Sequence, residues 1–297
     1  MKKVIAIVGP TASGKTGASI ELAEKLNTEI IAMDSMQIYR YMDIGTAKPT
    51  PKEMEGILHH MLDVAEPNDT YSVAQYKQAA MTCIQAIQRK GKTPVLVGGT
   101  GLYLRALSSD MHLGDTFGDA AIRGKYETYA KEYGNKALHE RLGDIDAETA
   151  ERLHENDVRR VIRALEIFEI TGLPLSKRKA SQPQSDLDIS VFGVLLERER
   201  LIERINQRVD NMFEQGLVQE VESLLHMGIS PEAQAMQGIG YKEIVPYLRG
   251  DLSLESVVET IKIRTRQYAK RQMTWFRATE GIHWEAPDKI VQSMLEV

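Results

Sequence analysis

VIAIVGPTASGKT, residues 4–16, places a phosphate-binding loop between a strand and a helix. A short β-branched run ends at Gly9, and Gly14, Lys15 and Thr16 complete the pattern G-x-x-x-x-G-K-[ST] before a helix-compatible segment. Glycines let the backbone curl around an anion, and the helix start and the lysine add positive charge. The loop is therefore predicted to hold phosphate, with Thr16 placed to ligate Mg²⁺.

Strands and helices continue to alternate after this loop. Apolar segments at 29–34 and 93–101 are typical of buried strands, and residues 71–90 have helical spacing, with Ser72 as the expected N-cap. Alternation of this kind predicts an α/β fold, a P-loop NTPase-like parallel sheet with helices on both faces. Because the carboxyl ends of parallel strands meet at one edge, the loops after these strands should converge with the phosphate loop.

The pattern changes to helical at about Asp110 and stays so to Lys179. We therefore expect a helical insertion domain, residues 110–179, within a core formed by residues 1–109 and 180–297. Three further core elements are predicted, namely a strand at 189–197 and long helices at 198–216 and 254–276.

Composition narrows the class of protein. The 297 residues are 42% hydrophobic and 27% charged, with a net charge of −5, as in ordinary globular proteins. No apolar run is long enough to span a membrane, and a single cysteine, Cys83, leaves no partner for an intrachain disulfide. We expect a cytoplasmic protein with no membrane association.

The acidic balance argues against a general nucleic-acid coat, but basic residues gather in two segments, 159–179 and 262–277. Local basic faces on an acidic protein suit a polyanion that is bound at a few places. The alternative for either segment is a solvated helix face.

Asp34 follows the second predicted strand, in the stretch DSMQIYR. It could assist Mg²⁺, bind a substrate hydroxyl, act as a general base, or cap the loop by accepting from backbone N–H groups. Gln37 and Tyr39 suit recognition of a flat polar ring, or packing and surface roles. The third strand ends in GGTG, so Thr100 offers a hydroxyl where nucleotide hydrolases carry an aspartate, which argues against a motor or switch ATPase.

Arg204 and Arg208 are four residues apart, on one face of a predicted helix. Such a pair can close over a diphosphate and stabilise the charge of a leaving group. It can equally be part of a solvated face paired with neighbouring glutamates.

The motifs GPTASGKT, DSMQIYRYMDIGTAKPT, VGGTGLYLRAL, HENDVRRVIRALEI, AMQGIGYKEI and KRQMTWFR occur in this order. Together they closely resemble the tRNA dimethylallyltransferase (tRNA isopentenyltransferase) family, from Val4 to about Trp284. That family transfers the dimethylallyl group of dimethylallyl diphosphate to N6 of an adenine beside the anticodon, position 37, and releases diphosphate. Some members carry a C-terminal zinc finger, for which this sequence lacks the cysteines, so the resemblance implies the short, bacterial type. We also expect the protein to act as a monomer.

The resemblance also implies roles for individual residues. The catalytic residues would be Asp34, Thr100 and Arg208. The diphosphate would be bound by Gly9, Pro10, Thr11, Ala12, Ser13, Gly14, Lys15 and Thr16, with Mg²⁺ on Thr16. The tRNA would be contacted by Asp34, Ser35, Met36, Gln37, Thr100, Arg123, Arg159, Arg160, Val161, Ile162, Arg163, Gln237, Gly238, Ile239, Gly240, Tyr241, Lys242, Lys270, Arg271, Gln272, Met273, Thr274, Trp275, Phe276 and Arg277. The helical insertion would grip the anticodon stem.

Other functions remain open from the sequence. A related branch prenylates free adenine nucleotides, although the basic segments and the insertion favour tRNA. A small-molecule kinase would use ATP at the same loop, with Asp34 on the acceptor hydroxyl. A non-catalytic protein would bind RNA in a nucleotide-dependent way without forming a covalent product.

Overall fold

The computed structural model describes residues 2–108, 118–177 and 187–296. The chain forms two compact units, one of residues 1–108 with 184–297 and one of residues 109–183. The predicted domain boundaries, at 109–110 and 179–180, lie outside the described residues.

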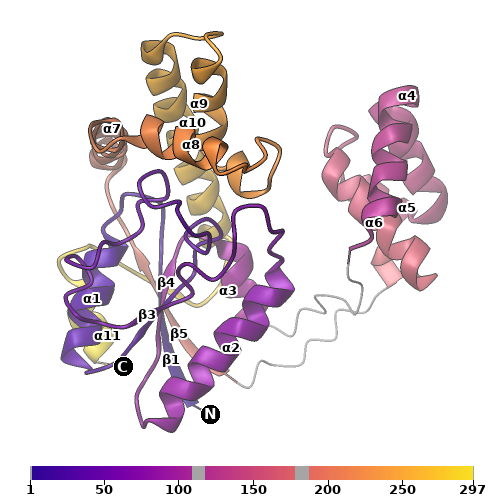
Figure 1. Cartoon of the computed structure of the whole chain (residues 1–297). Coiled ribbons are helices and arrows are strands. Elements are labelled where there is room, and N and C mark those ends of the chain that lie inside the picture. Colours follow the sequence, from indigo (N-terminus) through magenta and orange to yellow (C-terminus); the bar gives the residue numbers. More distant parts are fainter. Residues whose placement is uncertain (1, 109–117, 178–186, 297) are drawn as a thin grey trace. The chain divides into compact units, whose positions relative to one another are not determined.

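A six-stranded, wholly parallel sheet forms the centre of the larger unit (Figure 1). The strands are β1 (Lys2–Val8), β2 (Ile30–Ala32), β3 (His59–His60), β4 (Val95–Gly98), β5 (Leu187–Val194) and β6 (Ile282–Glu285), in the order β3-β2-β4-β1-β5-β6. The predicted strands at 29–34, 93–101 and 189–197 are confirmed as β2, β4 and β5. The sequence analysis missed β3 and β6, because two to four residues are too short for a recognisable strand pattern.

Helices cover both faces of this sheet, as predicted. They are α1 (Lys15–Lys25) and α11 (Ile290–Leu295) on one side, and α2 (Val73–Arg89) and α3 (Gly101–Ser108) on the other (Figure 1). Successive side chains of a strand point to opposite faces. Val4 and Ala6 therefore pack with α2 and α3, while Ile5 and Ile7 pack with α1 and α11. The predicted N-cap of α2 is confirmed, since Ser72 forms a capping box with Gln75.

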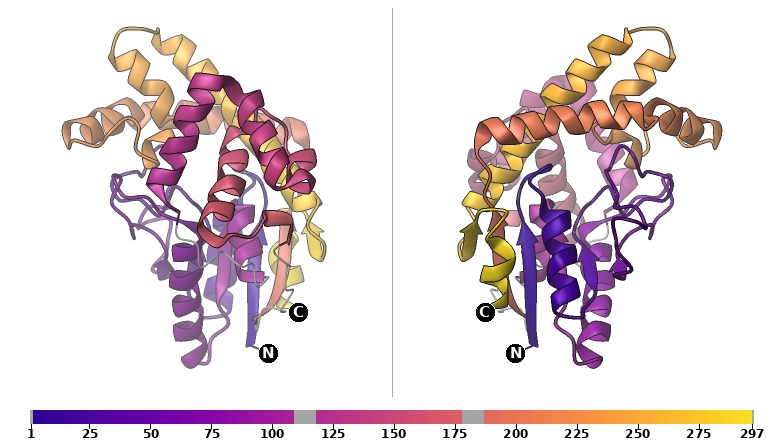
Figure 2. Two further views of the ribbon diagram at one scale, coloured as in Figure 1. Left: turned by 90° about the vertical axis from the view of Figure 1, so that its right-hand side faces the viewer. Right: turned by 90° about the vertical axis from the view of Figure 1, so that its left-hand side faces the viewer.

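A layer of helices lies beyond the carboxyl ends of the strands (Figures 1 and 2). It consists of α7 (Arg198–Glu214), α8 (Leu217–His226), α9 (Tyr241–Leu248) and α10 (Leu254–Arg277). The predicted long helices are confirmed as α7 and α10. α10 joins two cores, because Ile261 packs within the helical layer and Phe276 packs against the sheet.

Every regular element among the described residues of the smaller unit, 118–177, is a helix. The unit comprises α4 (Ala120–Ile145), α5 (Ala147–Arg152), α6 (Val158–Thr171) and a 3₁₀ turn, η1 (Leu175–Lys177). Gly134 has φ 89° and ψ 161° and kinks α4. Tyr126, Leu138 and Leu165 are among the side chains of its own small core. In neither unit does the described part of the chain contain a helix with the length and apolar character needed to cross a bilayer.

Gly98, the last residue of β4, should tolerate no side chain. A Cβ there would lie 2.0 Å from the carbonyl oxygen of Met33, where the turn after β2 passes close to β4. We expect Gly98→Ala to lower the free energy of unfolding by about 1–3 kcal/mol, the usual cost of overpacking.

Thermal and denaturant unfolding measure this effect. Gly17→Ala is the matched control, because a Cβ at Gly17 in α1 meets nothing within 4 Å and alanine is the better helix former. Equal stability of the two variants would contradict the close approach of the turns.

Candidate active site

A cavity of about 420 Å³ lies at the carboxyl-end edge of the sheet in the larger unit. Its wall comes from the turns after β1, β2 and β4, together with residues of α7 and α10. The predicted convergence of these turns is confirmed. This edge is where parallel α/β sheets bind their ligands.

The phosphate loop has the backbone conformation that its glycines allow. Gly9 and Gly14 have φ of 146° and 98°, which are accessible to glycine at little cost. Gly14 is the N-cap of α1, no side chain caps the helix, and its first turn carries no acidic residue. Ser13 adds a buried hydroxyl with no hydrogen-bond partner among the described residues. The loop thus offers uncapped N–H groups and a hydroxyl to an anion.

Two cations face this loop. Lys15 Nζ donates to the Pro10 carbonyl oxygen at 2.6 Å, and Arg208 Nη1 donates to Thr11 Oγ1 at 3.1 Å. Removal from water, aided by Arg208 and opposed by Asp34, lowers the pKa of Lys15 to about 7. Burial likewise lowers the pKa of Arg208. The site holds positive charge at a cost that an anionic ligand would remove.

Arg204 lies on the same face of α7. Its Nη1 atom is 3.5 Å from the place where a Cβ on Gly14 would stand. Among the described residues, neither Arg204 nor Arg208 forms an ion pair with the neighbouring glutamates of α7. The structure therefore favours the interpretation that Arg204 and Arg208 bind a diphosphate over the interpretation that they form a solvated charged face.

Asp34 both shapes its turn and faces the cavity. Its Oδ1 atom accepts from the backbone N–H of Met36 at 2.8 Å and of Gln37 at 3.4 Å, so the loop-capping role is present. Its charge also acts on Lys15 and Arg208, so it lies close to the phosphate loop. No described residue donates a hydrogen bond to its Oδ2 atom, which leaves one oxygen for substrate.

Thr100 connects the turns after β2 and β4. Its backbone N–H donates to the Met33 carbonyl at 3.2 Å, and its Oγ1 accepts from the N–H of Ser35 at 3.1 Å. The hydroxyl thereby fixes the residue that follows Asp34. Thr100 thereby helps to position Asp34.

Five of the predicted RNA-binding side chains are buried in the structure. These are Val161, Ile162, Tyr241, Gln272 and Phe276. Gln272 links the phosphate loop to the turn after β4, because its Oε1 accepts from the N–H of Thr11 at 2.8 Å and its Nε2 donates to the Gly99 carbonyl at 3.0 Å. The predicted RNA contacts at these five residues stay predictions: Gln272 lines the cavity, and burial of the other four side chains limits any contact there to backbone groups in this conformation.

Other predicted RNA residues do line the cavity. They are Asp34, Ser35, Met36, Gln37, Gln237, Gly238, Ile239, Lys242 and Arg271. The segment after α8 lies against the turn after β2, as a Cβ on Gly238 would come within 2.6 Å of Met36 Cε. Trp275, 38% exposed, packs against Gly101 at the start of α3.

Several cations of the second basic segment, residues 262–277, bind partners within the protein. Lys262 pairs with Asp210 at 2.7 Å, and Arg264 pairs with Glu243 at 2.8 Å. Arg266 Nη1 donates to Asn206 Oδ1 at 2.7 Å. These cations join α10 to α7 and α9, whereas Lys270, Arg271 and Arg277 in the C-terminal part of the segment are exposed.

In the smaller unit, two of the predicted RNA contacts surround a buried carboxylate. Glu166 accepts from Arg123 Nε at 2.8 Å and from Arg163 Nη1 at 2.5 Å. Burial raises the pKa of Glu166, but these hydrogen bonds outweigh burial and hold it below the ordinary value. Arg159 and Arg160, by contrast, are exposed on α6.

The sequence analysis also missed Tyr268, which lines the cavity from α10. Burial, reinforced by the charge of Asp34, raises the pKa of its phenol above the ordinary value. The hydroxyl is thus a neutral donor beside the acid. Its helical spacing resembles that of any packed tyrosine, so no pattern singled it out.

Comparison with known proteins identifies the family. A sequence profile described as IPP transferase matches residues 37–279. The chain belongs to the IPP transferase family. The resemblance predicted from the six motifs is thereby confirmed.

Members of the IPP transferase family are similar along nearly the whole chain. A protein of Acetivibrio thermocellus named tRNA dimethylallyltransferase is 47% identical, over 99% of this chain and 96% of its own. A protein of Bacillus cereus with the same name is 50% identical, over 95% and 89%.

Solved structures of IPP transferase relatives share the fold. The tRNA isopentenylpyrophosphate transferase of Bacillus halodurans superposes with a TM-score of 0.75 at 43% identity, over 100% of this chain and 95% of its own. A eukaryotic dimethylallyltransferase, studied as it acts on tRNA, gives 0.86 at 33% identity, over 99% and 78%. The predicted P-loop-like α/β fold is confirmed.

Lys15 should make diphosphate binding depend on pH. With a pKa of about 7 in the free protein, an increasing fraction of Lys15 is neutral above that pH. A bound anion favours the ammonium form and raises this pKa, so binding takes up a proton. We expect the affinity for inorganic pyrophosphate to fall by up to roughly ten-fold per pH unit above pH 7.

Calorimetric titration in two buffers of different ionisation enthalpy counts the proton. Lys15→Met is the control, because it reports only the titration of pyrophosphate itself. Equal proton uptake by the two proteins would show that Lys15 is already charged in the free site.

Proposed function

We propose that this chain transfers the dimethylallyl group of dimethylallyl diphosphate to N6 of adenine 37, beside the anticodon of tRNA, and releases diphosphate. One observation carries the proposal, namely that a phosphate-binding loop and a carboxylate, Asp34, converge in one cavity. Near-full-length relatives named tRNA dimethylallyltransferase support the assignment of donor and acceptor.

The phosphate loop binds the donor through its diphosphate. The uncapped N–H groups at the start of α1 and the Ser13 hydroxyl donate hydrogen bonds to the non-bridging oxygens. Lys15 and Arg208 stabilise the negative charge that grows on the leaving oxygen as the C1–O bond breaks. Burial makes the charged forms of Lys15 and Arg208 unfavourable in the free site. A bound anion offsets that desolvation cost.

A magnesium ion fits this donor set. Among the described residues, no group of three His, Cys, Asp or Glu side chains could enclose a metal. Mg²⁺ commonly takes one or two protein oxygens and completes its shell with phosphate and water, and Thr16 at the cavity wall supplies such an oxygen. When bound, the ion neutralises charge on the diphosphate.

Asp34 serves the acceptor. One of its oxygens is held by backbone N–H groups, so the other can accept from the adenine amino group and orient the nitrogen lone pair toward C1. The N6–C1 bond forms as the C1–O bond breaks, and the proton that N6 loses goes to Asp34. Thr100 maintains the position of Asp34 through the backbone of Ser35, and the neutral Tyr268 hydroxyl lies within reach of the charge of Asp34. The adenine leaves its stack to enter the cavity, as in other base-modifying enzymes.

Residues of both units contact the RNA. In the larger unit these are the cavity-wall residues after β2 and before α9, with Lys270, Trp275 and Arg277 on α10. In the smaller unit, Arg159 and Arg160 bind phosphates, and the insertion grips the anticodon stem. A splayed loop gives the specificity that double-stranded RNA lacks.

Nucleoside mass spectrometry tests the proposal. Unmodified tRNA, or adenosine monophosphate in its place, is incubated with Mg²⁺ and either dimethylallyl diphosphate or ATP. We expect prenylated adenosine only with tRNA and the prenyl donor. Modified adenosine monophosphate would indicate the nucleotide-prenylating branch, and phosphate transfer from ATP would indicate a kinase.

Asp34→Asn separates chemistry from loop structure. Asparagine retains an oxygen for the N–H groups of Met36 and Gln37 but cannot take a proton or carry charge. We expect kcat to fall by roughly 100-fold or more, with the Kd for tRNA within about two-fold of wild type. Asp251→Asn, an exposed position, is the control, and parallel losses in kcat and tRNA affinity would make Asp34 a purely structural residue.

The exposed arginines of α6 should contribute to the salt dependence of tRNA binding. Replacing both Arg159 and Arg160 with alanine removes two phosphate contacts, so the slope of log Kd against log salt should fall by roughly 1.5. Lys131→Ala with Lys136→Ala, exposed on α4, changes the net charge equally. The prediction fails where both pairs alter the slope to the same extent, since net charge alone would then explain the effect.

A further inference from the structure

Glu220 lies on α8 and binds a backbone turn that is distant in sequence. Its carboxylate accepts from three consecutive N–H groups, those of Asp43 at 2.9 Å, Ile44 at 2.7 Å and Gly45 at 3.0 Å. The Tyr241 hydroxyl donates to the same carboxylate at 2.6 Å. Four donors converge on one charged group, an arrangement that backbone turns otherwise offer to bound anions.

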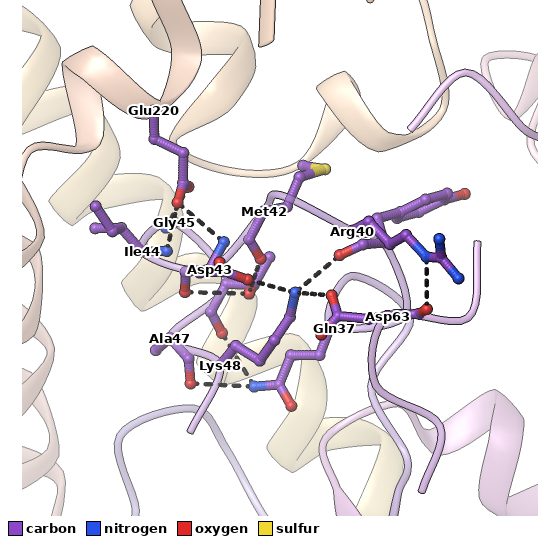
Figure 3. A network of polar contacts seen from close by, with 12 residues as sticks. Gln37, Arg40, Met42, Asp43, Ile44, Gly45, Ala47, Lys48, Asp63 and Glu220 are labelled. Atoms are coloured by element: carbon purple, nitrogen blue, oxygen red, sulfur yellow. Dashed lines mark hydrogen bonds and ion pairs between the residues drawn. The ribbon is translucent and has the colours of Figure 1, made fainter. Parts of the chain in front are cut away.

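The turn that Glu220 holds packs tightly against α9. A Cβ on Gly45 would lie 2.6 Å from the Tyr241 ring, which is buried. A second anchor fixes the other end, because Lys48 Nζ donates to the Tyr39 carbonyl at 2.9 Å and pairs with Asp43 and Asp63 at 2.5 and 2.6 Å. Figure 3 shows both anchors, with Glu220 above the turn and Lys48 within it.

The fixed turn in turn orients Gln37. The side-chain Nε2 of Gln37 donates to the carbonyl oxygens of Thr46 at 3.1 Å and Ala47 at 3.2 Å. Both amide hydrogens are therefore used on the turn, and the Oε1 atom points away from it (Figure 3). Gln37 and the two carbonyl-bearing residues line the cavity, and no described residue donates to Oε1.

We infer that Glu220 is a positioning residue for RNA recognition, because its hold on residues 43–45 makes Gln37 present only a hydrogen-bond acceptor to the substrate. The group that Gln37 accepts from is an N–H donor of a nucleobase in the RNA. A rotated amide would instead place its donors toward the base and reject that group. The inference rests on the proposed function, of which it specifies the acceptor side.

Steady-state prenylation of an anticodon stem-loop RNA tests this chain of contacts. Glu220→Gln removes the charge and one of the two equivalent acceptor oxygens while keeping the side-chain size. We expect the KM for RNA to rise roughly ten-fold, as for loss of a charge-assisted hydrogen bond, with the KM for dimethylallyl diphosphate unchanged within about two-fold. Glu222→Gln, exposed on the same helix, should match wild type.

A double-mutant cycle with Gln37→Ala distinguishes positioning from general support of the fold. In the Gln37→Ala background, Glu220→Gln should change the KM for RNA by less than about two-fold, because no amide remains to be oriented. The same fold-loss in both backgrounds would overturn the inference, as would a loss that falls on the KM for the prenyl donor.

Tyr241→Phe keeps the experiment informative where Glu220→Gln fails to fold. It removes one donor to Glu220 and leaves the buried ring in place, so a smaller rise in the KM for RNA is expected, again dependent on Gln37. Unchanged kinetics of Tyr241→Phe in a folded protein, together with unfolding of Glu220→Gln, would overturn the inference. Absence of prenylated RNA with the wild-type protein would instead contradict the proposed function itself.

Discussion

The amide of Gln272 holds together the two turns on which the site is built. Buried at the sheet end of α10, it accepts from the phosphate loop at Thr11 and donates to the turn after β4 at Gly99. The turn after β4 is linked through Thr100 to the turn that carries Asp34. One hydrogen-bonded chain therefore sets the distance between the phosphate loop and Asp34, the groups that we propose to hold the two reactants, whose orientation matters for the reaction.

The charges of the cavity are typical of a site that binds a diphosphate rather than of a site that hydrolyses a nucleotide with the help of a metal carboxylate. Lys15 and Arg208 are held partly desolvated with one carboxylate, Asp34, close enough to act on both. Such a site gains most from a ligand that brings several negative charges. The end of β4 offers the hydroxyl of Thr100 where hydrolases place a carboxylate, and that hydroxyl is engaged by Ser35. Asp34 thus lies in one cavity with the phosphate loop, as its proposed role toward the incoming nucleophile requires.

Local sequence predicted the elements whose causes are local. The phosphate loop, the cap at Ser72 and the long helices α7 and α10 follow from patterns within a few residues of chain, and all are present. Contacts between distant positions could not be predicted in this way. Gln272 and Thr11 are 261 positions apart, and Glu220 and Gly45 are 175 apart, so no local pattern connects them.

The same limit applies to those residues predicted to contact RNA whose side chains are buried in the structure. A sequence motif contains buried residues as well as exposed ones. The RNA contact predicted for each motif is therefore also assigned to Val161 and Phe276, which are buried. Arg123 is a basic residue in sequence, but its partner Glu166 lies on another helix and is fully buried. Such pairing across helices is a property of packing, and local sequence patterns do not contain it.

The most direct measurement is a crystal structure of this chain with pyrophosphate and an anticodon stem-loop RNA. The account predicts pyrophosphate on the N–H groups of the loop at Gly9–Thr16, with Lys15 and Arg208 against it, and the target adenine unstacked with N6 on Asp34. Pyrophosphate bound elsewhere, or an adenine whose amino group lies beyond hydrogen-bond reach of Asp34, would contradict it.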